Sequence, residues 1–138
     1  MFKKNIIYTD FNGQERKEVL YFHMSLVERT KLDAKLNGTP LDEYAKSLSI
    51  NKNTEEMVQF IENIILDSYG EKSADGKTFT KNKEIRDRFE NSQAYADLFE
   101  ELILNPDVAE AFAKGVVTQT KNINKASVTQ SNEIETLE

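Results

Sequence analysis

The stretch Thr54–Tyr69, TEEMVQFIENIILDSY, carries the clearest hydrophobic pattern in the sequence. Its apolar residues recur at the three- and four-residue spacing of a helix, and polar residues occupy the opposite side. We therefore predict an amphipathic helix over these residues, with its apolar stripe at the centre of the hydrophobic core. Gly70 is expected to end the helix, because a residue without Cβ suits a C-terminal cap. The residues expected to face the core are Met57, Phe60, Ile61, Ile64 and Ile65.

Two shorter helices are predicted before this central one. Ser25 and Glu28 form a capping box, in which the serine oxygen accepts from a free backbone amide and the glutamate reaches back. The helix that starts there should end near Gly38. Pro40 then opens a second helix, expected to run through about Leu48, because proline costs no hydrogen bond in a first helical turn.

Three further helices are predicted after a polar loop over Glu71–Lys81. In the first of them, Ile85 and Phe89 share one face. The second is expected over about Ser92–Leu104. The last begins at Asn105–Asp107, where Pro106 and its polar neighbours are typical of a helix start. Its residues expected to face inward are Val108, Ala111, Phe112 and Val116.

Residues 4–24 are predicted to form a β-hairpin, because two β-rich runs flank Asn12-Gly13. Two turns are open for it. A two-residue type I′ turn would set Asp10 opposite Glu15, which places two negative charges side by side. A bulged turn with Gly13 in the left-handed conformation avoids that pair. The hairpin's apolar face must pack on the helices, since an isolated hairpin is only marginally stable.

These elements predict an α+β fold that is mostly α-helical, with the N-terminal β-hairpin packed on a compact bundle of about five to six short helices. A chain of 138 residues fits one domain. We place that domain at residues 1–117, with the hairpin at 4–24 and the helical part at 25–117. Residues 118–138 are rich in Thr, Gln, Asn, Lys and Ser, so we predict a disordered C-terminal tail there.

Composition excludes several classes of protein. The sequence has no Cys, so it has no disulfide framework, thiolate zinc site or cysteine nucleophile. Its net charge of −6 argues against binding nucleic acid, which needs a basic surface. No apolar run is long enough for a membrane span, and the first ten residues are not an export signal. We expect a soluble protein with neither nucleic acid nor membrane as a partner.

No catalytic, cofactor-binding or metal-ligating residue is predicted. The segment Gly70–Thr78 ends like a phosphate-binding loop, but five residues separate its glycines where that loop needs four. The same segment lacks the glutamate that completes a calcium loop, because Asn82 stands at that position. His23 is the only histidine and is expected to be a half-buried strand residue. The sequence therefore indicates a protein that is not an enzyme and needs no cofactor.

Acidic residues concentrate in the second half of the chain. Residues 84–110 contain eight Asp or Glu against two Arg and no Lys, a net charge of −6. These side chains lie on the outer faces of the predicted helices. They indicate a solvated acidic surface that favours solubility or a basic partner segment.

The order of residues from Ile64 to Val117 resembles the tail assembly chaperones of long-tailed, siphovirus-type bacteriophages. The N-terminal segment Tyr8–Gly13 is also similar to the opening of that family. The resemblance rests on turns and core residues rather than on a catalytic signature. The segments that carry it are Ile65–Ser73, Asp75–Phe79, Ile85-Arg86 with Phe89, Ala94-Tyr95, Leu98-Phe99, Glu101-Leu102, and Phe112 with Gly115–Val117.

The resemblance implies a non-enzymatic helper of tail assembly. Such a chaperone binds the tape measure protein, the long helical ruler of the tail tube, and keeps it soluble while tube subunits polymerise around it. It acts in the cytoplasm of the host bacterium and is absent from the mature virion. Many members also exist in a longer form made by ribosomal frameshifting. Self-association and contact with the tail tube subunit are further interactions that the resemblance leaves open.

The last two predicted helices carry more apolar residues than one buried face requires, so we expect part of them to contact the partner. An alternative function, from a different class, is an acidic helical adaptor or DNA-mimic inhibitor of a host or phage protein. A small structural subunit of the particle is a third. The residues predicted to bind the partner are Leu98, Phe99, Ile103, Val108 and Phe112.

Overall fold

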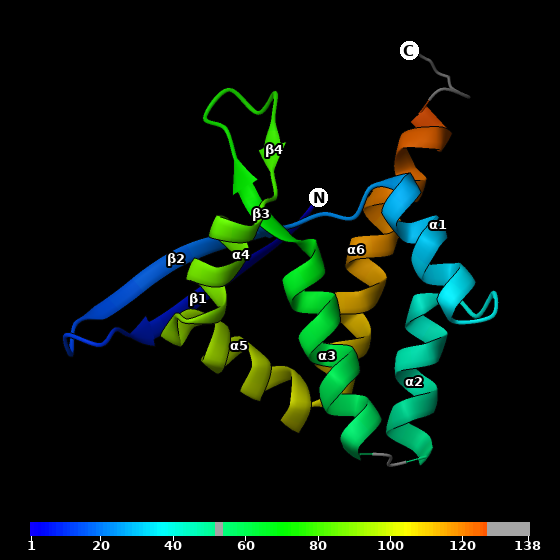
Figure 1. Cartoon of the computed structure of the whole chain (residues 1–138), viewed down its shortest axis with the longest axis horizontal. Coiled ribbons are helices and arrows are strands. Elements are labelled where there is room, and N and C mark those ends of the chain that lie inside the picture. Colours follow the sequence, from blue (N-terminus) through cyan, green and yellow to red (C-terminus); the bar gives the residue numbers. More distant parts are fainter. Residues whose placement is uncertain (52–53, 127–138) are drawn as a thin grey trace.

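The computed structural model describes residues 1–51 and 54–126 of the chain. Within them, six helices accompany a four-stranded antiparallel sheet (Figure 1), which confirms the predicted fold class. The sheet order is β1-β2-β3-β4, so each strand pairs with its neighbour in the sequence. The bounds are β1 Phe2–Thr9, β2 Glu15–Phe22, α1 Leu26–Lys35, α2 Leu41–Asn51, α3 Thr54–Ser68, β3 Tyr69–Lys72, β4 Phe79–Thr80, α4 Lys83–Glu90, α5 Gln93–Leu104 and α6 Pro106–Ala126.

The N-terminal hairpin has the bulged turn rather than the two-residue one. Thr9 of β1 stands opposite Glu15 of β2, and Gly13 has a φ of 81°. The amide of Gly13 donates to the carbonyl of Asp10 at 2.9 Å, which closes a type I turn. The Asp10 carboxylate accepts the amides of Asn12 and Gln14, both at 2.9 Å. This register keeps Asp10 away from Glu15, as the charge argument required.

A second hairpin replaces the loop that the sequence predicted over Glu71–Lys81. Strand β3 pairs with both β2 and β4, so it joins the short hairpin to the sheet. The side chains of Ser73 and Asp75 close the turn of this hairpin. The Ser73 hydroxyl donates to Asp75 at 2.6 Å, and that carboxylate accepts the amide of Lys77 at 3.0 Å.

Gly70 is part of strand β3 and is not the helix cap that we predicted. It is buried, and a Cβ added to it would lie 2.6 Å from the Phe79 ring and 2.8 Å from Cγ of Lys81. The glycine is therefore required by close packing between the two strands of the short hairpin, not by a helix end.

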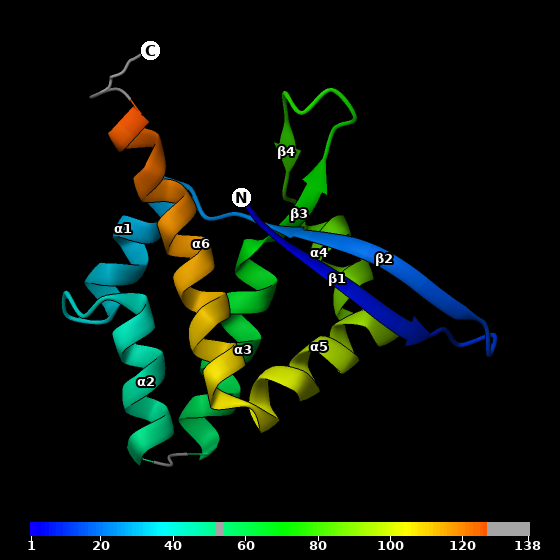
Figure 2. The ribbon, with the colours of Figure 1, turned by 180° about the vertical axis from the view of Figure 1, so that it is seen from behind.

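Helix α3 lies among the other helices, as predicted, and packs against α2, α4, α5 and α6 (Figure 1). Ile61 and Ile65 have no exposed surface. The hairpin β1–β2 meets the helices mainly through β1, which packs against α5 and α6 rather than on α3. Seen from behind in Figure 2, α6 runs beside α2 and close to β1.

Aromatic rings connect the sheet to α4 and α6. Phe22 of β2 contacts Phe112 edge to face, with ring centroids 4.9 Å apart. Tyr69 of β3 stacks on Phe89 of α4 at 3.8 Å. Phe2 of β1 also packs on Phe112, at 5.1 Å. These rings form one core that spans both layers of the fold.

Helix α6 differs from the sequence prediction in two respects. It continues to Ala126, so the segment 118–126, predicted as part of the disordered tail, is helical. Residues 127–138 of that predicted tail lie outside the described residues. The inward face is also rotated: Ala111 is exposed, whereas Ala109 and Ala113 are buried with Phe112 and Val116. Two alanines and a valine allow α6 and α2 to approach closely.

Candidate partner-binding site

The five residues predicted to bind a partner separate into two groups. Leu98 and Phe112 are 0% and 1% exposed and belong to the hydrophobic core. Phe99, Ile103 and Val108 are partly buried and pack against the edge of that core. The surplus of apolar residues on α5 and α6 is therefore largely used within the protein, and three side chains stay accessible at this edge.

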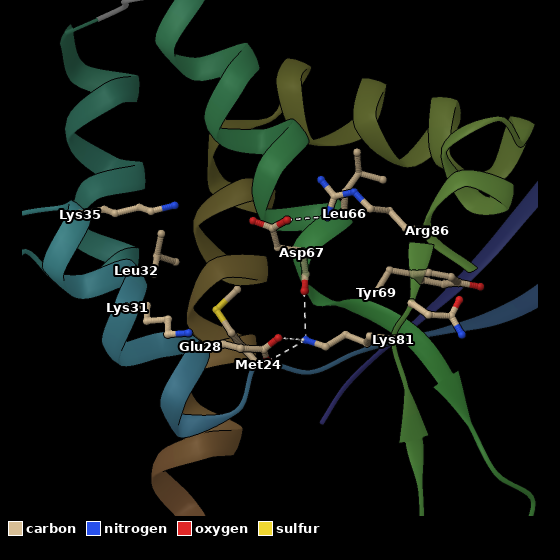
Figure 3. Close-up of a pocket in the computed structure, with 11 residues that line it drawn as sticks. Met24, Glu28, Lys31, Leu32, Lys35, Leu66, Asp67, Tyr69, Lys81 and Arg86 are labelled. Atoms are coloured by element: carbon tan, nitrogen blue, oxygen red, sulfur yellow. Dashed lines mark hydrogen bonds and ion pairs between the residues drawn. The ribbon is translucent and has the colours of Figure 1, made fainter. Parts of the chain in front are cut away.

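The described residues form a groove between α1 and α3. It consists of two adjoining cavities of about 360 and 230 Å³, which share Met24, Leu32, Lys35 and Asp67 as lining residues. Figure 3 shows the first cavity, with α1 on one side and the end of α3 on the other. The apolar side chains that line the groove are Met24, Leu32, Leu36, Phe60, Ile64 and Leu66.

Helix α1 forms one wall of this groove and buries little of its own surface. None of its residues is fully buried, and Leu26 and Val27 are 54% and 63% exposed. Its contact with the core is made by Leu32, with Leu36 just after its last turn. The helix itself is well terminated. The Ser25–Glu28 capping box is present as predicted, and the amide of Gly38 donates to the Asp33 carbonyl at 2.8 Å.

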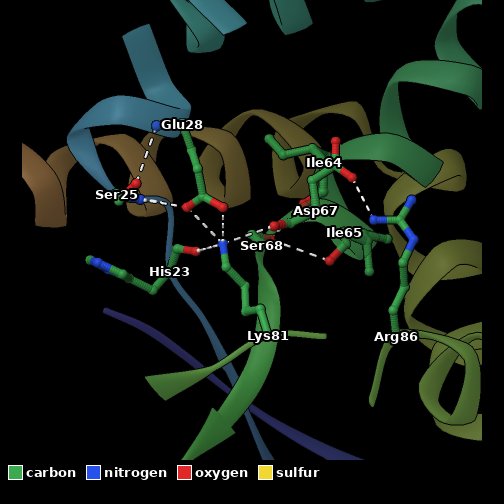
Figure 4. A network of polar contacts seen from close by, with 9 residues as sticks. All are labelled: His23, Ser25, Glu28, Ile64, Ile65, Asp67, Ser68, Lys81 and Arg86. Carbon is green, nitrogen blue, oxygen red and sulfur yellow. Dashed lines mark hydrogen bonds and ion pairs between the residues drawn. The ribbon is translucent and has the colours of Figure 1, made fainter. Parts of the chain in front are cut away.

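Lys81 ties the start of α1 to the rest of the fold (Figure 4). Its ammonium donates to the carbonyls of His23 and Asp67, both at 3.0 Å, and to the Glu28 carboxylate at 2.7 Å. Burial acts to raise the pKa of Glu28, but hydrogen bonds from Lys81 and from the Ser25 amide outweigh it and lower that pKa. The carboxylate is thus ionised at neutral pH and holds α1 in place.

The rim of the groove is mostly basic. Lys81 and Arg86 are already paired, with Glu28 and with Asp67 at 2.6 Å. Lys31 and Lys35, one helical turn apart on α1, have no ion pair among the described residues and extend toward the cavity in Figure 3. The α3 side carries Glu56, Gln59 and Asn63. The sequence offered no signal for this site, because it depends on how α1 lies against α3.

His23 is the one predicted feature whose surroundings allow a pH test. It follows β2 rather than lying in it, is half buried as predicted, and its Nδ1 is buried without a hydrogen-bond partner. Burial is the main cause that lowers its pKa from 6.5, and the positive charges of the N-terminus and Lys81 act in the same direction.

We expect the free energy of unfolding to decrease as the pH falls below 6.5, the unperturbed pKa of histidine. The sign follows because the unfolded chain takes up this proton at a higher pH than the folded protein does. His23→Phe should remove the dependence between about pH 7.5 and pH 5, a range above the titration of ordinary carboxylates. Urea unfolding of the wild type and of the His23→Phe variant across this range measures the pH dependence of the free energy of unfolding. A wild-type protein as stable at the lower pH as at the higher one would contradict the expectation.

Other kinds of site are missing from the described part of the chain. No group of three His, Asp or Glu side chains there could hold a metal ion. Of the helices within residues 1–51 and 54–126, none combines the length and apolar character needed to cross a bilayer. What the geometry offers is a groove between α1 and α3 that is lined by apolar and by charged side chains.

Comparison with known proteins identifies the family. A family model described as phage tail assembly chaperone matches residues 1–136, nearly the whole chain. The chain belongs to the phage tail assembly chaperone family. No curated protein and no solved structure matches it. Membership confirms the resemblance seen in the sequence, places the protein among tail assembly chaperones, and implies a role in tail assembly within the infected host cell.

Proposed function

We propose that this chaperone binds the tape measure protein and keeps it soluble while the tail tube assembles. The observation that carries the proposal is the groove between α1 and α3, with apolar and charged side chains on its lining, in a member of this family. Tape measure helices expose apolar seams that aggregate when uncovered, and a groove of this kind can cover such a seam.

The action is non-catalytic in this proposal and takes place in the cytoplasm of the host bacterium. The chaperone leaves the tape measure protein as tube subunits replace it, so it is absent from the mature virion. The partly buried edge residues Phe99, Ile103 and Val108 provide a second, smaller contact with the same partner. The acidic side chains elsewhere on the surface keep the complex soluble.

Coexpression with the tape measure protein of the same phage tests the proposal. We expect the tape measure protein to move from the insoluble to the soluble fraction and to copurify with the chaperone. Leu32→Asp, at the centre of the groove, should reduce both effects. Lys46→Asp, at an exposed position on α2, is the matched control. A tape measure protein that stays insoluble with and without the chaperone, with no complex recovered, would refute the proposal and favour the adaptor function.

A further inference from the structure

The groove between α1 and α3 has unequal walls. On the α1 side, Lys31 and Lys35 are exposed and have no ion pair within the described residues. On the α3 side, Glu56 stands with the neutral amides Gln59 and Asn63. One long edge of the groove is therefore positive, although the whole chain has a net charge of −6. A local charge opposite to that of the protein is the kind of feature that selects and orients a partner.

The neighbouring charges do not neutralise this edge. Glu28 pairs with Lys81 and accepts the Ser25 amide, and Asp67 pairs with Arg86. Both carboxylates that line the larger cavity therefore already have a cation as a partner. The two α1 lysines are left to pair with an acidic group of another molecule. Because they are four residues apart, their ammonium groups lie along one line parallel to the groove.

We propose that the groove takes a partner helix whose apolar seam is flanked on one side by acidic side chains, which pair with Lys31 and Lys35. The inference rests on the proposed function and adds the chemistry and orientation of the bound segment. The apolar seam covers the partly buried side chains Leu32 and Phe60, and the acidic flank faces α1. The reversed placement is disfavoured, because the α3 residues that line the groove include no Lys or Arg to pair with an acidic flank.

Charge reversal on α1 tests this inference. The probe is the purified complex with the tape measure protein of the same phage. Lys31→Glu/Lys35→Glu should weaken binding roughly tenfold, because two attractive pairs become repulsive. Lys17→Glu/Lys46→Glu changes the net charge equally at exposed positions outside the groove, and its affinity should stay within about twofold of wild type. High salt should weaken the wild-type complex more than the groove variant.

The outcomes separate the two proposals. If the wild-type chain does not bind the tape measure protein, the proposed function fails. If it binds, and the groove variant and the control bind equally well, this inference is overturned. Both variants should keep the wild-type melting temperature, since all four lysines are exposed. A lysine introduced at the acidic position of the partner helix should restore binding to the groove variant.

Two other occupants would also overturn the inference. If a second copy of this chain occupied the groove, the wild type would sediment as a dimer and the groove variant as a monomer, and both would bind the tape measure protein equally well. The chain's own C-terminal end is acidic at Glu133, Glu135 and Glu138. If it occupied the groove, changing these three residues to Gln in the full chain would shift the backbone NMR signals of Leu32 and Lys35 in the free protein.

Discussion

Ile61→Asp is expected to unfold most of the protein under conditions in which the wild type is folded. Ile61 lies on the core face of α3 and has no exposed surface, so the new carboxylate would be buried without a partner. Burying an unpaired ionised carboxylate costs several kcal/mol, and the lost packing of the isoleucine adds about 2–5 kcal/mol, whereas a domain of this kind is stable by only about 5–15 kcal/mol. Loss of helical circular dichroism and of the cooperative urea transition would record the effect.

Two control variants isolate the cause. Ile61→Val keeps an apolar side chain and should cost about 0.5–1.5 kcal/mol. Val58→Asp introduces the same carboxylate three residues earlier on α3, at a position that is 36% exposed, and should be far milder. If Ile61→Asp melted within about two degrees of wild type, the core face assigned to α3 would be wrong.

Elements governed by local interactions were predictable from the sequence. The capping box at Ser25 and Glu28 depends on four consecutive residues, and α1 begins where it predicts. The apolar stripe of α3 is likewise local, and Ile61, Ile64 and Ile65 are buried as predicted. The sequence left two turns open for the hairpin, and the one that avoids the like-charge pair at Asp10, the bulged turn, is the one that forms.

Features that depend on distant contacts were missed. Strands β3 and β4 are short and mostly polar, and they form because β2 offers an edge to Tyr69 and Gly70. Gly70 followed a helical pattern and looked like a cap, although its role is close packing against Phe79. The face of α6 that points inward could not be predicted from the sequence either. Small residues at 109 and 113 face inward because of tertiary packing.

In the candidate site, too, local features were predictable and features that depend on distant contacts were not. Apolar spacing identified Leu98 and Phe112 as important but could not distinguish a core position from a contact position, because both require the same residue types. The groove joins residues that are more than twenty positions apart in the sequence, such as Leu32 and Phe60. Lys31 and Lys35 become candidates for binding an acidic partner only because the carboxylates nearby are already paired with Lys81 and Arg86.

Phe112→Ala is expected to lower the free energy of unfolding by about 3–5 kcal/mol. Phe112 is 1% exposed and packs edge to face on Phe22 and Phe2, so its removal leaves a cavity between the sheet and α6. The sequence placed this residue among the partner contacts. Its burial predicts instead that the variant acts on folding, and that the remaining folded protein binds the tape measure protein with an affinity within about twofold of wild type.

Val108→Ala is the matched variant for this test, because Val108 lies one turn earlier on α6 and is only partly buried. It should cost about 1 kcal/mol or less, since one small side chain is shortened at the edge of the core. Urea unfolding of both variants, followed by binding measured on the folded fraction, compares the two positions. If Phe112→Ala were as stable as wild type yet failed to bind the tape measure protein, Phe112 would be a contact residue, and the assignment of this face of α6 to the core would have to be abandoned.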